Sequence, residues 1–266
     1  MLHRPFQAST MLCMTDERVR ITDEGAVRLL TLSRPEKKNA FDIAMATQLW
    51  EAIEAAQSDP SVRVVAVTGE GDYFSGGADV SLFLSFASLD PRDVAKVGRL
   101  YEPLRACEKP TIAIVQGHAV GMGVTLLPHF DLVYAADHVT FTTPFVKLGL
   151  VLEYGSAYTL SRLIGPSRTK ELILRAAPLD ALTAADWGLV TRVFPATALR
   201  ASALGIAQEL AANPPSALAE SKRLIERGAH MSFEEATQAE DAALASRYGS
   251  DENVRAIHEI LQRKRT

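Results

Sequence analysis

Two segments of this chain repeat one design, in which a short and almost continuously apolar run leads into a glycine-rich loop and then into a helix start. The first segment covers 62–79 and the second covers 111–123. Apolar runs without polar alternation are typical of strands buried on both faces, as in parallel sheets. Parallel strands need long crossovers, which are usually helices. The two segments therefore predict an α/β fold with a mainly parallel sheet and helices outside it.

The remaining pattern extends this fold to about residue 195 and then changes. Further strands are predicted at 19–22, 27–32, 132–135, 139–142 and 190–193, and helices at 42–57, 91–107, 124–129, 156–164 and 167–174. After residue 195 the pattern predicts helices only, with breaks at 213–215, Gly228 and Gly249. We therefore expect three regions, with the third packed against the second: a variable N-terminal tail (1–18), a core (19–195) and a helical C-terminal region (196–266).

The composition argues against several classes of function. The chain has 266 residues and a hydrophobic content of 47%, so it can bury a substantial core. Its formal net charge is −4 and no long basic stretch is present, so we expect no nucleic-acid partner. No apolar run is long enough to cross a membrane, so we expect no membrane partner either.

The cysteines and histidines suggest neither a disulfide framework nor a metal site. The two cysteines, Cys13 and Cys107, have neither metal-binding nor redox spacing. A reducing cytoplasm is therefore the expected location. Histidines, cysteines and carboxylates do not cluster at ligand spacing, so no metal is predicted.

Glu153 is the one carboxylate in the apolar run 148–156, just before a predicted helix. A carboxylate among Val151, Leu152 and Tyr154 loses hydration, which disfavours its charged form and raises its pKa. Such a group is a useful proton shuttle at neutral pH. A second interpretation is that Glu153 only places negative charge at the helix N-terminus, where the helix dipole stabilises it.

The two glycine loops, within 74–79 and 117–123, favour the proton shuttle. Glycines let the backbone approach a ligand closely, and helix starts leave N–H groups unpaired. Two N–H groups that converge on one point form an oxyanion hole. Each loop alone is equally compatible with an ordinary turn. Two matched loops together with a lone buried carboxylate favour a catalytic site.

Five motifs form one recognisable set: Leu32-Ser33-Arg34-Pro35 with Asn39-Ala40, Phe74-Ser75-Gly76-Gly77-Ala78-Asp79, Gly117-His118-Ala119-Val120-Gly121-Met122-Gly123, Phe130-Asp131-Leu132-Val133-Tyr134-Ala135 and Ala185-Asp186-Trp187-Gly188-Leu189-Val190. With them the chain resembles the crotonase family, also called the enoyl-CoA hydratase/isomerase family, from about Val19 to its C-terminus. The resemblance implies a spiral of strand–strand–helix repeats, with a helical C-terminal region that assembles a homotrimer or a dimer of trimers. It also implies an acyl-CoA ligand, so coenzyme A is part of the substrate and no separate cofactor is expected.

The resemblance also assigns site residues. In such proteins, N–H groups at the positions of Ala78 and Met122 hold the thioester oxygen, and the nucleotide lies near 34–40 and along 76–80. The predicted substrate-binding residues are Lys37, Lys38, Gly76, Gly77, Asp79, Val80, Gly121, Thr125, Phe145 and Leu148. The two lysines are equally compatible with a solvated surface charge pair, and Asp79 with a brace for its own loop.

Departures from the family pattern narrow the expected chemistry. Hydratases of this family use two glutamates, at the positions of Thr125 and Phe145, and neither side chain here can replace a carboxylate. Glu153 instead matches the single glutamate of peroxisomal-type 3,2-enoyl-CoA isomerases. The resemblance therefore implies a fatty-acid β-oxidation enzyme in which Glu153 moves a proton from C2 to C4 of a 3-enoyl-CoA.

Two alternatives stay open. The first is other crotonase-family chemistry, such as a hydratase that uses Glu153 for both proton transfers, or an enzyme for halogenated or ring-derived acyl-CoA substrates. The second is a non-catalytic acyl-CoA-binding protein, which coenzyme A binding without turnover would support.

Overall fold

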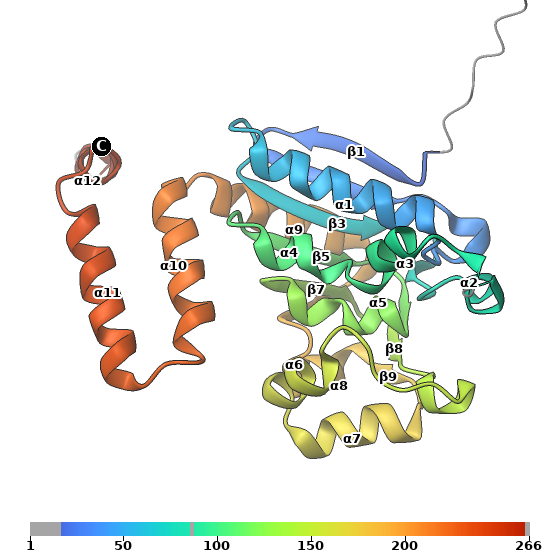
Figure 1. Cartoon of the computed structure of the whole chain (residues 1–266). Helices are drawn as coiled ribbons and strands as arrows, with labels where there is room; N and C mark the ends of the chain where they lie inside the picture. Colours follow the sequence, from blue (N-terminus) through green and yellow to red (C-terminus); the bar gives the residue numbers. More distant parts are fainter. Residues whose placement is uncertain (1–16, 86–87, 264–266) are drawn as a thin grey trace, which may run out of the picture.

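The structure, a computed structural model, describes residues 17–85 and 88–263, so most of the predicted tail at 1–18 lies outside the described residues. The described strands form a larger sheet in the order β1-β2-β3-β5-β7-β10 and a smaller one in the order β4-β6-β8-β9 (Figure 1). Their bounds are β1 (Val19–Glu24), β2 (Val27–Leu32), β3 (Val64–Gly69), β4 (Tyr73–Ser75), β5 (Thr111–Val115), β6 (His118–Val120), β7 (Leu132–Ala136), β8 (Thr140–Thr142), β9 (Leu179–Asp180) and β10 (Arg192–Phe194).

The chain alternates between the two sheets. Strands β3, β5 and β7 lie in the larger sheet, and the strands that follow them, β4, β6 and β8, lie in the smaller one. Pairing is parallel except for β1 with β2 and β8 with β9. Every residue of β3 and β5 is buried, as the continuous apolar runs indicate. The mainly parallel α/β fold with strand–strand–helix repeats is therefore confirmed.

The helices connect and cover these strands. Their bounds are α1 (Ile43–Ser58), α2 (Val80–Ser85), α3 (Pro91–Gly98), α4 (Tyr101–Ala106), α5 (Met122–Thr125), α6 (Ser156–Leu163), α7 (Pro166–Arg175), α8 (Ala181–Trp187), α9 (Ala196–Ala211), α10 (Pro215–Gly228), α11 (Phe233–Arg247) and α12 (Asp251–Arg263). The single helix predicted at 91–107 is wrong, because α3 and α4 are separate. Pro103 lacks an N–H, and in a continuous helix its ring would clash with the carbonyl of Arg99, which favours a kink or break at this point.

Two long helices enclose the larger sheet. Helix α1 begins at the N-cap Asp42, whose side chain accepts a hydrogen bond from Met45 N at 2.8 Å. It contacts β1 and β2. Helix α9 lies behind the sheet in Figure 1 and contacts β2, β3, β5, β7 and β10. The apolar side chains between these layers form the core, which holds β4 and β6 and the glycine loops that follow them in place.

The last three helices stand apart from the core (Figure 1). No residue of α10 or α11 is buried. Helix α10 is tied to the core by Lys222, whose Nζ lies 2.8 Å from Asp131 Oδ2 and 3.2 Å from the carbonyl oxygen of Lys109. The expectation that all of 196–266 packs against the core is therefore wrong for α10–α12, which stand apart from it and leave apolar side chains uncovered: Phe233 is 82% exposed.

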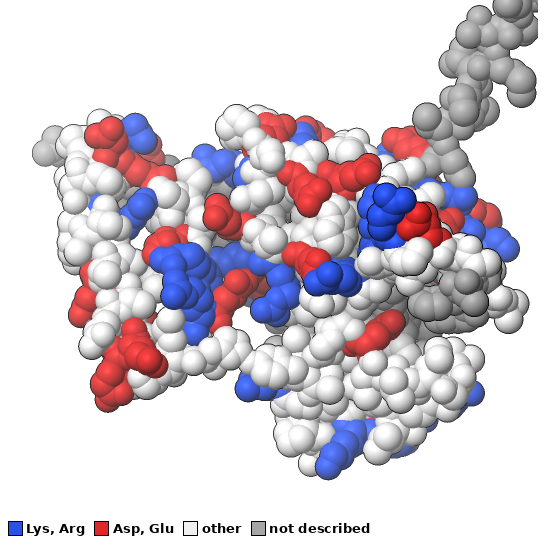
Figure 2. All heavy atoms as spheres, in the orientation of Figure 1, with Lys and Arg blue, Asp and Glu red and all other residues white. Residues whose placement is uncertain are grey.

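The surface beside α10 is strongly charged. Figure 2 shows basic side chains gathered where α10 faces the core, and the groove there is lined by Arg105, Lys222, Arg223 and Arg247, among others.

No helix within the described ranges is long and apolar enough to cross a membrane.

The buried side of β2 gives a stability prediction. Leu30 is fully buried in the core, whereas Leu182 is 67% exposed on α8. Leu30→Ala should lower the free energy of unfolding by about 2–5 kcal/mol because it removes apolar contacts and leaves a cavity. Leu182→Ala should change it by less than about 0.5 kcal/mol. Urea unfolding followed by circular dichroism measures both, and equal effects would contradict the placement of β2.

Candidate active site

Two cavities meet at Glu153, Ala78 and Met122. The smaller cavity, the helix lobe, has a volume of about 150 Å³ and is lined by Ile43, Ala78, Leu82, Leu89, Val94, Val97, Gly98, Met122 and Glu153. The larger, the loop lobe, has a volume of about 360 Å³ and is lined by Gly76, Gly77, Ala78, Val80, Val120, Gly121, Met122, Pro144, Phe145, Leu148, Leu150, Val151 and Glu153. Because they share three lining residues, the lobes adjoin, and together they form the candidate site.

Glu153 lies at the junction of the lobes and is partly buried. Among the described residues that line either lobe, it is the only one with a titratable side chain. Burial raises the pKa of Glu153 to about 7, although a hydrogen bond from Thr125 opposes this shift. That bond is long, at 3.4 Å between Thr125 Oγ1 and Glu153 Oε1. A carboxyl group with such a pKa can take up and release a proton near neutral pH.

The two glycine loops approach each other beside Glu153. Gly77 has φ +89° and Gly121 has φ +52°, which side-chain-bearing residues rarely adopt. A Cβ on Gly77 would lie 2.8 Å from the carbonyl oxygen of Val120 and 3.5 Å from the backbone nitrogen of Met122. Only glycine therefore permits this close approach.

The N–H groups of Ala78 and Met122 have no hydrogen-bond partner among the described residues. Met122 is the first residue of α5, so its N–H has no acceptor within the helix. The neighbouring N–H groups are used: that of Gly77 donates to Ser75 Oγ and that of Asp79 donates to the carbonyl of Phe41. Two unpaired N–H groups beside a carboxyl group can hold an oxygen that gains negative charge.

The first glycine loop is fixed by Arg34 and Asp79. Arg34 Nη1 lies 2.7 Å from Asp79 Oδ2, and Ser81 donates hydrogen bonds to Asp79 Oδ1 from its backbone and its side chain. Burial alone would raise the pKa of Asp79, but the bonds from Ser81 and Arg34 outweigh it and lower the pKa to about 2. Asp79 is therefore ionised and committed to bracing its loop.

The predicted substrate-binding residues divide into two groups. Those that line the loop lobe are Gly76, Gly77, Val80, Gly121, Phe145 and Leu148. Those that line neither lobe are Lys37, Lys38, Asp79 and Thr125. Lys38 still adjoins the loop lobe, because its carbonyl accepts a hydrogen bond from the Gly76 N–H at 2.7 Å. Its ammonium group lies 5.0 Å from the centre of the Tyr73 ring.

Tyr154 is a structural link that the sequence did not reveal. Its hydroxyl donates a hydrogen bond to the carbonyl of Val97 on α3 and lies 2.7 Å from the Met122 sulfur. Its own carbonyl lies 2.9 Å from His129 Nε2, which must carry the hydrogen because a carbonyl only accepts. Burial lowers the pKa of His129 to about 4, so the ring is neutral above that pH. Tyr154, at φ +54°, therefore joins the Glu153 segment to α3 and α5.

The helix lobe was also missed by sequence reasoning. Val94 and Val97 lie three residues apart on α3, a spacing that places both on one helix face. That spacing was a usable signal for an apolar face. It could not show which cavity the face would line, because α1, α2 and α5 complete that cavity from distant parts of the chain.

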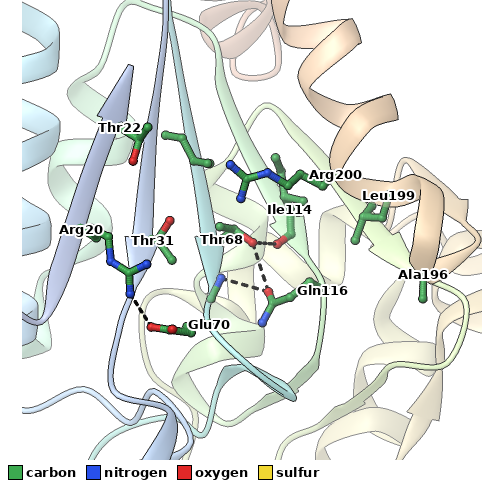
Figure 3. Close-up of a pocket in the computed structure, with 12 residues that line it drawn as sticks. Arg20, Thr22, Thr31, Thr68, Glu70, Ile114, Gln116, Ala196, Leu199 and Arg200 are labelled. Atoms are coloured by element: carbon green, nitrogen blue, oxygen red, sulfur yellow. Dashed lines mark hydrogen bonds and ion pairs between the residues drawn. The ribbon is translucent and has the colours of Figure 1, made fainter. Parts of the chain in front are cut away.

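A third cavity, of about 280 Å³, lies between the larger sheet and α9 (Figure 3). Several of its polar side chains have partners: Arg20 Nη2 lies 2.6 Å from Glu70 Oε2, and Gln116 Oε1 accepts from Gly69 N at 3.0 Å. Arg200 Nη2 lies 2.9 Å from Glu24 Oε1, outside the cavity lining. Its lining carboxyl group, Glu70, is held by Arg20, unlike Glu153. In the part of the chain that the structure describes, no group of three or more His, Cys, Asp or Glu residues is placed to hold a metal ion.

Comparison with known proteins places this site in a family. The model of the family described as enoyl-CoA hydratase/isomerase matches residues 22–265. Enoyl-CoA delta isomerase 2 from Homo sapiens is 34% identical over 252 residues, which cover 92% of this chain and 63% of that protein. The chain thus spans less than two thirds of the length of this relative. 2,3-Dehydroadipyl-CoA hydratase from Escherichia coli is 29% identical and covers 92% of this chain and 95% of the relative.

A solved structure of similar fold supports the same placement. The enoyl-CoA hydratase from Polaromonas sp. JS666 superimposes with a TM-score of 0.86 at 28% identity, covering 92% of this chain and 97% of that one. The match of the family model over nearly the whole chain, together with the shared fold, shows that this chain belongs to the enoyl-CoA hydratase/isomerase family.

Proposed function

We propose that this protein isomerises 3-enoyl-CoA to trans-2-enoyl-CoA. The observation that carries the proposal is the lone titratable side chain, Glu153, among the described residues lining the two lobes. Moving a double bond from C3 to C2 needs one group that takes a proton and returns it. Adding water needs one group to activate the water and another to protonate the α-carbon. A site with one such group therefore suits isomerisation better than hydration.

In the proposed reaction Glu153 removes the proton from C2 of the substrate. This proton is acidic because C2 lies between the thioester carbonyl and the double bond, so its loss gives a delocalised dienolate. The unpaired N–H groups of Ala78 and Met122 hold the oxygen as it gains charge, which typically contributes about 3 kcal/mol per donor. Glu153 then returns the proton at C4, and the apolar walls of both lobes keep water from competing for the dienolate.

Coenzyme A enters this proposal as part of the substrate, with no separate cofactor. Its phosphates need cations. Arg34 is already paired with Asp79, whereas Lys37 and Lys38 are further basic residues in the segment that adjoins the first glycine loop. The hydrogen bond between Gly76 and Lys38 supports an approach from the side of the loop lobe. The human relative, an enoyl-CoA delta isomerase, supports the same reaction class.

Hydration is the second candidate, because the relative from Escherichia coli is a hydratase at a similar level of identity. It would require Glu153 to perform both proton transfers. A third outcome, acyl-CoA binding without turnover, would make the chain a binding protein. An assay with a 3-enoyl-CoA separates isomerisation from the other two, since only isomerisation produces the conjugated thioester from that substrate. Loss of the absorbance of a 2-enoyl-CoA then separates hydration from binding without turnover.

The proposal includes assembly of the chain into a homotrimer or a dimer of trimers. Helices α11 and α12 expose apolar side chains that have no cover in the isolated chain: Phe233, Leu244, Tyr248, Val254, Ile257, Ile260 and Leu261 are each at least 41% exposed. Large exposed apolar surfaces are typical of interaction sites. In this proposal, further copies of the chain cover these exposed side chains.

Replacing Glu153 tests the proposal directly. With a trans-3-enoyl-CoA, wild type should produce the ultraviolet absorbance of the conjugated thioester, and Glu153→Gln should lower kcat by about 10²–10⁴-fold, because the proton shuttle is lost. Glu234→Gln, on an exposed position of α11, is the matched control and should keep wild-type activity. Near wild-type activity in Glu153→Gln would refute the assignment.

The pH dependence follows from the pKa of Glu153, which is about 7 in the free protein. The carboxylate is the active base, so kcat/KM should rise with pH, reach half its maximum near pH 7 and level off above it. The hydrogen bond from Thr125 lowers this pKa. Thr125→Val should therefore move the rise to higher pH. A profile that stays flat between about pH 5 and pH 9 would contradict this role for Glu153.

Gly77→Ala tests the close approach of the loops. The new Cβ would lie 2.8 Å from the carbonyl of Val120, so the loops must separate and the N–H groups lose their alignment. We expect kcat to fall by about 10²–10³-fold. Gly25 also has a positive φ, but a Cβ there meets nothing within 4 Å, so Gly25→Ala controls for backbone strain alone. Equal kcat in the two variants would show that the close approach is not needed.

A further inference from the structure

The two lobes have similarly apolar linings but differ in volume and in what adjoins them. Apart from Glu153, all described lining residues of both lobes are apolar or glycine. The loop lobe is larger and adjoins Lys38 through the bond between Gly76 N and the Lys38 carbonyl. A ligand with a phosphorylated end and an alkyl end would therefore place its charged end on the loop side, toward Lys38, and its alkyl end in the helix lobe.

The volume of the helix lobe limits how much alkyl chain it holds. A cavity of about 150 Å³ in a protein core takes up one benzene, which has six carbons. The helix lobe has the same volume of about 150 Å³. With the carbonyl carbon at the N–H groups of Ala78 and Met122, and C2 to C4 beside Glu153, the next six or so carbons fill the lobe. A straight chain of roughly ten carbons therefore fits best.

Helix α3 provides the wall that sets this limit. Val94, Val97 and Gly98 line the lobe from one face of the helix. The carbonyl of Val97 is held by the hydroxyl of Tyr154, the residue after Glu153, so α3 is anchored to the reacting centre. Val94 lies one helical turn from that anchor and is partly buried. The Val94 side chain is therefore held at a fixed place in the lobe. Its size determines how many carbons of acyl chain the lobe can hold.

We infer that the substrates are straight-chain acyl-CoA thioesters of medium length and that Val94 is the residue that sets the preferred chain length. This inference rests on the proposed function, because it takes Glu153, Ala78 and Met122 as the reacting centre. It goes further by naming the alkyl class and the residue that discriminates within it.

Binding of saturated acyl-CoA thioesters tests the inference without requiring turnover. Calorimetric titration of wild type with chains of four to fourteen carbons should show affinity rising about fourfold per added methylene, and levelling off near ten carbons when the lobe is full. Val94→Phe adds about four carbons of side chain and should move the levelling point to shorter chains by three or four carbons. Val94→Ala removes two carbons of side chain and should move the levelling point to chains about two carbons longer.

Ala95→Leu is the matched control, because Ala95 is exposed on the same helix and does not line the lobe. It should give the wild-type length profile. Thermal unfolding checks that all variants fold. If Val94→Phe does not fold, the preference of Val94→Ala for longer acyl chains still tests the inference. Identical levelling points in wild type and Val94→Ala, or affinity independent of chain length in wild type, would overturn the inference.

The same experiment separates this inference from the proposed function. Saturated chains have no double bond to move, so their length profile is independent of isomerase activity. A shift in the profile without turnover of 3-enoyl-CoA would support the lobe assignment and refute the proposed reaction. Turnover without a shift would support the reaction and refute the role of Val94.

Discussion

The contact between the two glycine loops is the constraint on which the candidate site depends. Gly77 lies so close to the carbonyl of Val120 that no other residue fits, and Gly121 needs a positive φ to begin α5 at this point. Together they bring Ala78 and Met122, which are 44 positions apart in the sequence, to the walls of the same two lobes. The parallel pairing of β4 with β6 holds the loops in this arrangement. Without the contact, Glu153 would be a desolvated carboxyl group with no neighbouring donors for a charged product.

The environment of Glu153 carries a cost in stability. Its pKa in the folded protein, about 7, is raised from an ordinary value of 4.5. Between these two pH values the folded protein binds more protons than the unfolded chain, so this group's contribution to stability falls as pH rises through that window. Sites that need a displaced pKa commonly have this effect. Ionised Asp79, by contrast, stabilises its loop through Arg34 and Ser81.

Sequence reasoning predicted elements well where one local pattern dominated and failed where distant residues intervened. The buried strands β3 and β5 and the breaks between α9, α10, α11 and α12 follow from apolar runs, glycines and prolines. The split between α3 and α4 was missed, although Pro103 gave the signal for it. The short strands β4 and β6 lie within segments described from sequence as glycine loops, because their pairing partners are far away in the chain.

The sequence alone determined the fold class, the family resemblance and the position of the lone carboxylate, because these depend on local patterns and on motifs of adjacent residues. Tertiary structure decided what surrounds that carboxylate. The helix lobe combines residues of α1, α2, α3 and α5. Tyr154 reaches Val97 across 57 positions. From the sequence, Asp79 could contact a ligand or brace its own loop. The fold brings Arg34, 45 positions away in the sequence, into a hydrogen bond with it. Such contacts arise only when the sheets order the chain, since no local pattern encodes which distant segments meet.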